Sequence, residues 1–395
     1  MSLRLLSALF ALASTASCLG PTPDPTPTPS DPPVTTTAPP APTTTPGPLT
    51  TQTRFPALSK VAAVGQWNFA LDKDLGAFQA LYPDEVFSRF AAEGFTAVRL
   101  AIDPEMLADA SGTLYQDRFA EIVTAISRIE AAGLGVVFDM HVWKQGEWMQ
   151  QENIDRLARM WEQMGAALSG FDPSLTFLEL YNEPAWWSEP ELWAGVETQL
   201  YVAARGAAPN LPIVLTGPKS GGIEGLPESP VIEDSNVVYT IHMYNPLPFT
   251  HQGSPWTDDV AYGTADRLPF PATPEACADA IGRQPTPEAT QLATDYCAGG
   301  YDEAWVRNEF ATAAAWAEAH GVQLFLGEFG VSPSATMEDG TRWLRAVRTA
   351  AEDFGMGWSI WEADGPMGLR NSGWYTTIAD EPVPEVLAAL GLNNA

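Results

Sequence analysis

Eight short apolar segments recur along this chain, and stretches with helical periodicity follow most of them. Each apolar segment is continuous rather than alternating, which is typical of strands that are covered on both faces. The segments span residues 62–69, 97–102, 135–142, 175–183, 213–218, 237–244, 323–331 and 355–363. Amphipathic helical patterns lie at residues 84–92, 115–132, 154–168, 190–207, 303–320, 341–354 and 383–390. This repetition predicts an α/β fold, a (β/α)8 TIM barrel whose ring is closed by the last helix.

The alternative architecture is an open, doubly wound parallel sheet. Such a sheet usually carries glycine-rich phosphate-binding loops after its early strands, and this sequence has none there. The sequence therefore favours the closed barrel, in which functional side chains gather at the carboxyl ends of the strands.

The N-terminal region reads as an export signal. Arg4 precedes an apolar run at residues 5–13 that is too short to span a bilayer, which predicts a signal peptide over residues 1–18. The peptide ends at Cys18 in the sequence TASC, which resembles a bacterial lipobox and predicts lipidation of that cysteine. The chain would then be an exported lipoprotein of the cell surface or periplasm, with a lipid anchor in a bacterial membrane. Plain secretion is the alternative.

Residues 19–53 consist largely of proline and threonine. Such a segment cannot bury a core, so we predict a disordered linker there and one folded domain over residues 54–395. The domain contains only two cysteines, Cys277 and Cys297. Because an exported chain meets oxidising conditions, we expect these two cysteines to form a disulfide.

The chain is strongly acidic, with a formal net charge of −29 and only four lysines among 395 residues. A nucleic-acid-binding face needs clustered Lys and Arg, so this charge argues against nucleic acid as a partner and disfavours anionic membrane surfaces. It suits a soluble protein that acts on a neutral polymer, and we expect a monomer.

Two glutamates lie at the ends of strand-like segments that are far apart in the sequence. Glu183 lies in the sequence Asn182-Glu183-Pro184, and Glu328 lies near the end of segment 323–331. Hydrolysis of a glycosidic bond needs two carboxyl groups, one to protonate the leaving oxygen and one to attack or stabilise the anomeric carbon. A helix cap or a surface position would explain either glutamate alone, whereas one site at the barrel mouth explains both.

Further polar side chains interrupt the apolar segments near the same ends. They are Arg99, His141, Asn182, His242 and Tyr244, and the aromatic Trp361 joins them on the last segment. Burying polar groups without partners is costly, so a shared pocket explains the set, although a salt bridge or a core histidine could account for one member. Asp139 and His141 form an Asp-x-His pair, which is too little to predict a metal site. We expect neither a metal nor a cofactor.

Together these residues resemble the active site of glycoside hydrolase family five, the cellulase-like retaining barrels. That family places Arg, His, Asn-Glu, His, Tyr, Glu and Trp on successive strands, and this chain matches in order at Arg99, His141, Asn182, Glu183, His242, Tyr244, Glu328 and Trp361. The resemblance covers about residues 60–392. It departs in the loops, chiefly in an enlarged segment from residue 246 to about residue 301.

The resemblance implies a retaining reaction in which Glu183 is the acid/base and Glu328 is the nucleophile. Arg99 would favour the ionised form of Glu328, and burial with a nearby anion should raise the pKa of Glu183. Asn182 would bind the sugar 2-hydroxyl. The other implied roles are orientation of the two carboxyl groups by His242 and Tyr244, contact with sugar hydroxyls by His141, and a flat apolar face from Trp361.

Four tryptophans expected on the barrel-mouth loops favour an extended polysaccharide groove, because indole rings stack on sugars: Trp143, Trp186, Trp187 and Trp256. The leading hypothesis is an endo-β-1,4-glucanase that cleaves a neutral β-linked polysaccharide. The alternatives are a β-mannanase, xyloglucanase or β-1,3-glucanase of the same family, and exo rather than endo attack. A non-catalytic carbohydrate-binding barrel is a further alternative, against which the two intact glutamates argue.

Overall fold

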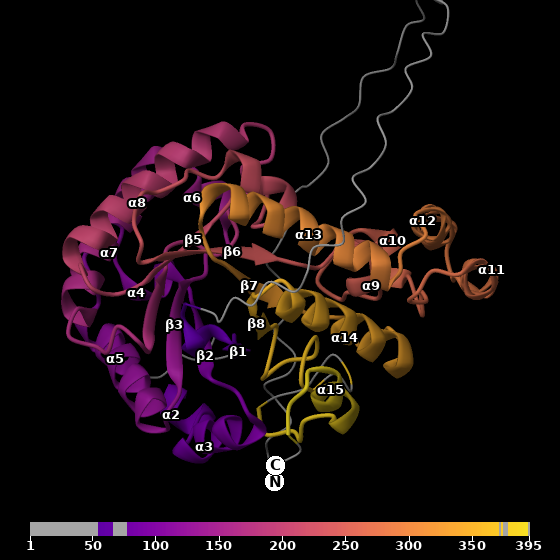
Figure 1. Ribbon diagram of the computed structural model, residues 1–395, viewed down its shortest axis with the longest axis horizontal. Helices are drawn as coiled ribbons and strands as arrows, with labels where there is room; N and C mark the ends of the chain where they lie inside the picture. Colours follow the sequence, from indigo (N-terminus) through magenta and orange to yellow (C-terminus); the bar gives the residue numbers. More distant parts are fainter. Residues whose placement is uncertain (1–53, 66–76, 371–372, 374–377, 394–395) are drawn as a thin grey trace, which may run out of the picture.

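The computed structural model describes residues 54–65, 77–370, 373 and 378–393. The predicted signal peptide, Cys18 and the linker lie outside the described residues, as does the end of the first predicted strand at residues 66–69. Within the described part, eight parallel strands pair in chain order and close into a barrel (Figure 1). The predicted TIM barrel is confirmed.

The strands form one ring because β1 pairs with both β2 and β8, and Val61 stands opposite Ala97 on one side and Ser359 on the other. Several strands are shorter than the predicted segments, because those segments continue into the loops at the mouth. The strand bounds are β1 Lys60–Val64, β2 Ala97–Ile102, β3 Gly135–Met140, β4 Thr176–Glu179, β5 Ile213–Thr216, β6 Val237–His242, β7 Leu324–Phe329 and β8 Gly357–Ile360.

Helices cover the outside of the barrel, and those predicted from periodicity begin and end within a few residues of the expected positions. They are α3 Asp84–Glu93, α5 Gln116–Ala131, α7 Gln151–Leu168, η2 Pro190–Leu192 with α8 Trp193–Ala207, α13 Glu303–His320, α14 Met337–Asp353 and α15 Pro384–Ala389. The shorter helix η1 Pro56–Leu58 precedes β1. Others lie in the connections: α2 Ala77–Leu81, α4 Pro104–Leu107, α6 Gln145–Trp148 and η3 Ile223–Glu228. In the parts of the chain that the structure describes, no helix combines the length and the apolar character needed to cross a membrane.

The barrel interior changes from apolar to charged along the strands. Near their amino ends, side chains such as Val137 and Phe177 pack into a separate apolar cluster. Alternate residues of a strand face the same side, so β2, β3 and β4 each place a charged residue two positions further along the interior. These residues, Arg99, Asp139 and Glu179, are all 0 % exposed. The floor of the barrel mouth is therefore a layer of buried charges.

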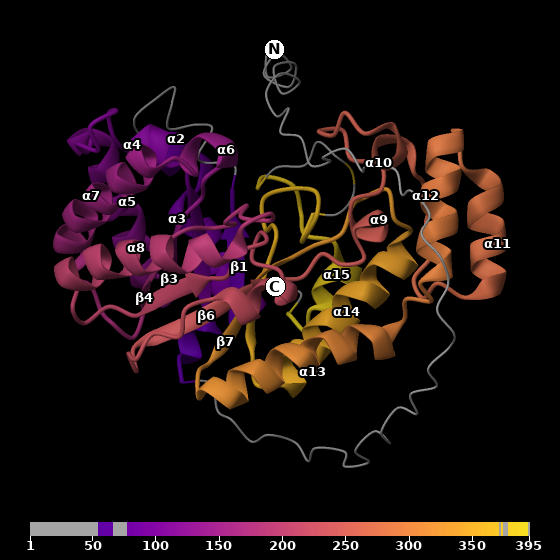
Figure 2. The same ribbon diagram turned by 90° about the horizontal axis from the view of Figure 1, so that it is seen from above.

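The connection between β6 and α13 is enlarged and carries four helices: α9 Leu247–Thr250, α10 Val260–Thr264, α11 Pro274–Arg283 and α12 Pro287–Ala298. Figure 2 shows α11 and α12 side by side at the edge of the molecule. The predicted disulfide between Cys277 and Cys297 joins these two helices, with the Cα atoms 5.8 Å apart. At the base of the insertion, the backbone N–H of Ser332 donates to the carbonyl of Thr250 at 2.9 Å. The insertion is thereby tied to the loop that follows β7.

Candidate active site

Glu328 lies near the end of β7 and is 3 % exposed. Arg99 of β2 donates from Nη1 to its Oε1 at 2.6 Å, and the hydroxyl of Tyr244 donates to its Oε2 at 2.9 Å. Burial, and then the charge of Glu328, raise the pKa of Tyr244 well above its usual value, so the hydroxyl keeps its proton. Both oxygens of Glu328 are thus held by donors, one of them cationic.

Glu183 lies in the loop directly after β4, and its side chain is 31 % exposed. The Nδ1 atom of His242 lies 2.8 Å from Oε1 of Glu183. The register between β6 and β7 shifts after Ile241, which sets His242 opposite Glu328. One oxygen each of Glu183 and Glu328 and one ring nitrogen of His242 all lie within 4.8 Å of one another. Two carboxyl groups this close fit the retaining separation of about 5–5.5 Å, and the wider separation of about 6.5–9.5 Å belongs to inverting enzymes.

The expectation that Glu183 has a raised pKa is wrong for this arrangement. Burial acts in the raising direction, but the hydrogen bond and charge of His242 outweigh it and lower the pKa of Glu183. For His242 the directions are reversed. Burial alone would lower its pKa, but the charge of Glu328 and the hydrogen bond to Glu183 raise it above the usual value. The two side chains therefore hold a proton as a pair, with His242 as its favoured carrier.

Arg99 is the central cation of the site. Its Nε and Nη2 donate to the two oxygens of Glu179 at 2.7 Å each, and Nη2 also lies 3.0 Å from Oδ2 of Asp139. Nη2 further donates to Oδ1 of Asn182 at 2.7 Å. With the contact to Glu328, one guanidinium faces three carboxyl groups and an amide. The sequence prediction paired Arg99 with Glu328 alone.

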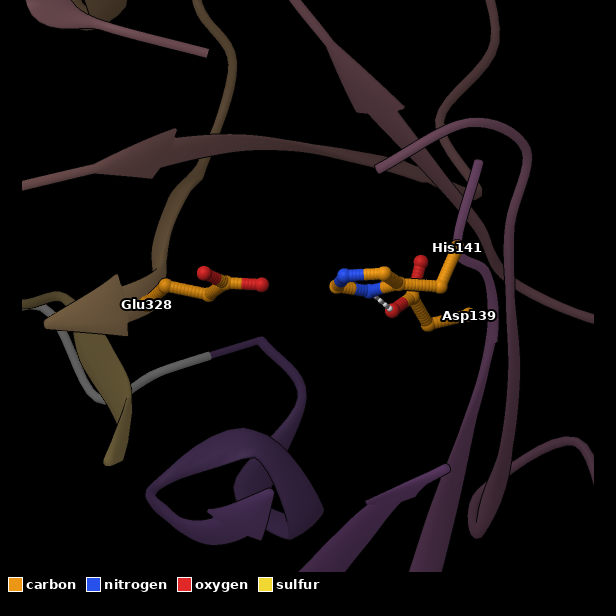
Figure 3. A group of neighbouring side chains, drawn as sticks. All are labelled: Asp139, His141 and Glu328. Atoms are coloured by element: carbon orange, nitrogen blue, oxygen red, sulfur yellow. Dashed lines mark hydrogen bonds and ion pairs between the residues drawn. The ribbon is translucent and has the colours of Figure 1, made fainter. Parts of the chain in front are cut away.

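His141 faces Glu328 across the barrel mouth, and Asp139 lies beside its ring (Figure 3). The Nδ1 atom of His141 is 2.7 Å from Oδ2 of Asp139, and Nε2 is 3.3 Å from Nδ2 of Asn182. Burial lowers the pKa of His141 to about 4, so the neutral ring donates from Nδ1 to Asp139. The indole of Trp361 stacks on the imidazole ring of His141, with ring centroids 5.1 Å apart and planes at 11°.

Asp139, His141 and Glu328 also offer three potential metal-ligand atoms within 4.8 Å of one another. The carboxyl groups of this set already face the guanidinium of Arg99, at 3.0 Å for Asp139 and 2.6 Å for Glu328. A second cation would have to displace these contacts, so we assign no metal ion to this group.

The structure thus brings together all eight residues predicted for the site. Trp361 contacts His141, which contacts Asn182, which contacts Arg99, and Arg99 and Tyr244 hold Glu328. The remaining two are His242, whose Nδ1 lies 3.7 Å from Oε2 of Glu328, and Glu183, which contacts His242 at 2.8 Å.

The four tryptophans predicted for the mouth loops divide into two groups. Trp143, Trp187 and Trp256 are 43 %, 51 % and 46 % exposed. Trp186 is only 5 % exposed and packs against Tyr181 and Trp193, with ring centroids 6.2 Å and 4.9 Å away. The prediction that Trp186 lines the cleft is therefore wrong, because its indole anchors the loop after β4 to α8.

Sequence reasoning missed Glu179 as a site residue and treated Asp139 only as a weak metal-ligand candidate. Both are acids within otherwise apolar strands, which is the same signal that identified Arg99. A buried arginine needs buried counter-charges, and applying that rule to the neighbouring strands would have found both acids.

Comparison with known proteins places this chain among carbohydrate-active enzymes. Residues 76–365 match the family model described as cellulase (glycosyl hydrolase family 5). Cellodextrinase A of Ruminococcus flavefaciens is 24 % identical over 303 residues, which cover 74 % of this chain and 82 % of that protein. Endoglucanase 3 of Fibrobacter succinogenes is 25 % identical over 308 residues, covering 72 % of this chain and 46 % of the relative. Among solved structures, an endoglucanase from the hyperthermophilic Thermotoga maritima superposes with a TM-score of 0.68 at 23 % identity, covering 85 % of this chain and 98 % of that one.

Proposed function

The chain belongs to glycosyl hydrolase family 5, and from that premise we propose that it is a retaining endo-β-1,4-glucanase with Glu183 as acid/base and Glu328 as nucleophile. Family membership makes it a glycoside hydrolase, whereas the substrate, the mode of attack and the residue roles are the proposal. The observation that carries it is the approach of Glu183 and Glu328 to within 4.8 Å, each held by its own donor.

In the first step, an oxygen of Glu328 attacks the anomeric carbon and forms an ester while the glycosidic C–O bond breaks. The leaving oxygen takes a proton from Glu183, and His242 at 2.8 Å supplies that proton from the pair. Arg99 and Tyr244 hold Glu328 in place before attack. Asn182 accepts from Arg99 through Oδ1, and its Nδ2 lies 3.3 Å from Nε2 of His141. One amide N–H therefore donates to His141, and the other remains for the sugar 2-hydroxyl.

In the second step, Glu183 removes a proton from a water molecule, and the resulting hydroxide attacks the anomeric carbon. The ester bond to Glu328 breaks, its carboxylate is restored, and the sugar leaves with its original configuration. The proton returns to the Glu183–His242 pair, so the site is ready for another cycle.

A neutral glucan suits both the charge and the surface of the chain. The net charge of −29 would repel an anionic polymer. The exposed indoles of Trp143, Trp187 and Trp256 offer stacking faces on three different mouth loops. Relatives that bear the names endoglucanase and cellodextrinase further support a glucan substrate.

The test is to follow viscosity and new reducing ends together on a soluble β-1,4-glucan. Endo attack lowers the viscosity steeply while few reducing ends form. Release of small sugars at unchanged viscosity would establish exo attack instead. If kcat/KM in a parallel panel is higher on β-mannan, xyloglucan or β-1,3-glucan, that glycan is the substrate instead of β-1,4-glucan. Binding without any cleavage would identify the chain as a non-catalytic carbohydrate-binding barrel.

We also propose that the enzyme is exported and held at a bacterial membrane through lipid on Cys18. The lipobox-like sequence and the proline- and threonine-rich segment over residues 19–53 support this location. Cys18→Ser should move the enzyme from the membrane fraction to the soluble fraction. A wild-type protein that is already soluble and begins beyond Cys18 would establish plain secretion.

A further inference from the structure

Three carboxyl groups share one buried guanidinium beneath the mouth of the barrel. Arg99, Asp139 and Glu179 are 0 % exposed and Glu328 is 3 % exposed. The arginine lies 2.6 Å from Glu328, 2.7 Å from Glu179 and 3.0 Å from Asp139. If all three acids were ionised, this cluster would carry a net charge of −2 out of reach of water. Buried charge of that size is costly, and binding a proton is the usual way in which such a site lowers the cost.

The hydrogen bonds indicate which acid holds that proton. Glu179 receives a donor from Arg99 on each oxygen. Glu328 receives Arg99 on one oxygen and Tyr244 on the other. Asp139 differs, because its Oδ2 faces His141 and Arg99 while its buried Oδ1 has no hydrogen-bond partner among the described residues. An ionised carboxylate with one bare oxygen is the least stable of the three.

We propose that Asp139 carries a proton on Oδ1 in the resting enzyme and acts as a positioning residue for the nucleophile. With Asp139 neutral, only Glu179 and Glu328 draw on the positive charge of Arg99, so the contact between Arg99 and Glu328 has one fewer competing anion. Oδ2 of the neutral acid still accepts from Nδ1 of His141, which fixes the ring that faces Glu328 (Figure 3). The positioning of Glu328 as nucleophile rests on the proposed function. The assignment of the proton to Asp139 does not depend on it.

The surroundings of Asp139 agree with this assignment. Burial raises its pKa to about 7, with Arg99 opposing and Glu328 reinforcing the rise. The charged and titratable groups that face the cluster come from five strands or strand ends: Arg99, His141, Glu179, Glu183, His242 and Glu328. Burial also raises the pKa of Glu179 to about 7. The bidentate contact with Arg99 makes Glu179 the poorer proton carrier, because an added proton would displace a guanidinium donor.

Infrared difference spectra between wild type and single variants test the proposal without any substrate. A protonated carboxyl group has a carbonyl stretch that an ionised one lacks. At pH 5–6, this band should lose one component in Asp139→Asn, and that component should titrate near pH 7 in the wild type. In Glu179→Gln it should remain but titrate at lower pH, because one neighbouring anion is gone. Loss of the component in Glu179→Gln and its retention in Asp139→Asn would assign the proton to Glu179 and overturn the proposal.

The pH dependence of kcat/KM on whichever glycoside the enzyme turns over gives the second readout. The side-chain amide introduced by Asp139→Asn mimics the neutral acid, so this variant should keep the position of the acid limb. In the wild type, Asp139 is ionised at alkaline pH, and its negative charge helps to hold the proton on the Glu183–His242 pair. The variant lacks this charge, so its alkaline limb should move to lower pH by roughly half a unit. A shifted acid limb would show that Asp139 is ionised in the active form and would overturn the proposal.

Glu197→Gln is the matched control. Glu197 on α8 is 1 % exposed, and its Oε1 accepts the backbone N–H of Thr216 at 2.7 Å. Burial raises its pKa well above the usual value, and its buried Oε2, like Oδ1 of Asp139, has no hydrogen-bond partner among the described residues, so we expect it to carry a proton as well. The control should lose an infrared component yet move neither limb of the rate profile. The infrared spectra need no substrate, so they test the protonation of Asp139 even if the enzyme prefers another glycan. The proposed function can therefore be wrong while the proton assignment is right, and the reverse.

Discussion

The hydroxyl of Tyr244 lies 2.9 Å from Oε2 of Glu328 and fills the one oxygen of that carboxylate which Arg99 leaves open. Two donors, one from β2 and one from the loop after β6, therefore fix the orientation of the group that we propose as nucleophile. A hydrogen bond to a charged group contributes about 1.5–3 kcal/mol, which is enough to matter for the rate.

Tyr244→Phe removes this donor and keeps the ring. We expect kcat to fall about 10- to 100-fold while KM changes little, because the hydroxyl holds Glu328 rather than the sugar. Steady-state kinetics on an aryl cellobioside measure both constants. Tyr239→Phe is the control: Tyr239 lies on β6, just before Tyr244 in the chain, and its hydroxyl donates to the carbonyl of Pro230 instead. An unchanged kcat in Tyr244→Phe would contradict the role of this contact.

Substitution of the two glutamates should have different effects. Glu328→Gln should lose nearly all turnover on every substrate, because an amide cannot form the covalent intermediate. Glu183→Ala should lower kcat/KM on polysaccharide by about 100- to 10,000-fold. It should largely spare kcat/KM on aryl glycosides, whose good leaving groups need no proton in the first step, although kcat should still fall because Glu183 also activates water in the second step. Comparing the two variants on polymer and on aryl cellobioside separates the roles. Near-wild-type activity of either variant on polymer would rule out the assignment.

The barrel and the shared site were predictable because both depend on local patterns. Continuous apolar segments identify buried parallel strands, and the barrel rule places their carboxyl ends at one mouth. A residue such as Arg99 within the apolar sequence of β2 is visible without coordinates. The disulfide was predictable for a similar reason, since Cys277 and Cys297 are the only cysteines of the domain.

Three features depend on packing that the sequence does not display. The lowered pKa of Glu183 follows from the 2.8 Å approach of His242, which comes from β6 to a side chain in the loop after β4. Burial of Trp186 follows from α8, which presents Trp193 to it. The sharing of Arg99 among three acids requires the side-chain directions of β2, β3, β4 and β7 together. The first and third features are contacts between segments that lie far apart in the chain, whereas Trp186 and Trp193 are close in sequence and meet because the loop after β4 folds back on α8.

The Glu183–His242 pair makes a prediction about pH. The pKa of His242 is raised, so the pair keeps its proton above the ordinary imidazole value of about 6.5 and loses it as the pH rises through the folded pKa. Because the leaving oxygen needs that proton, the alkaline limb of kcat/KM on polymer should lie above pH ~6.5. A limb clearly below that value would mean that His242 does not retain a proton for Glu183. Aryl glycosides with good leaving groups serve as the comparison, since their glycosylation step should show little of this limb.

The tryptophans of the mouth loops should divide into binding and structural residues. Trp187→Ala and Trp256→Ala each remove an indole that is about half exposed, so each should weaken binding of soluble polymer roughly 2- to 10-fold, and kcat on short substrates should change little. Trp186→Ala should instead leave a cavity between Tyr181 and Trp193 and lower the free energy of unfolding by about 3–5 kcal/mol. Affinity electrophoresis in a soluble β-glucan measures the first effect, and urea unfolding measures the second. If Trp186→Ala weakened polymer binding at full stability, its indole would have to reach the cleft, which its 5 % exposure opposes.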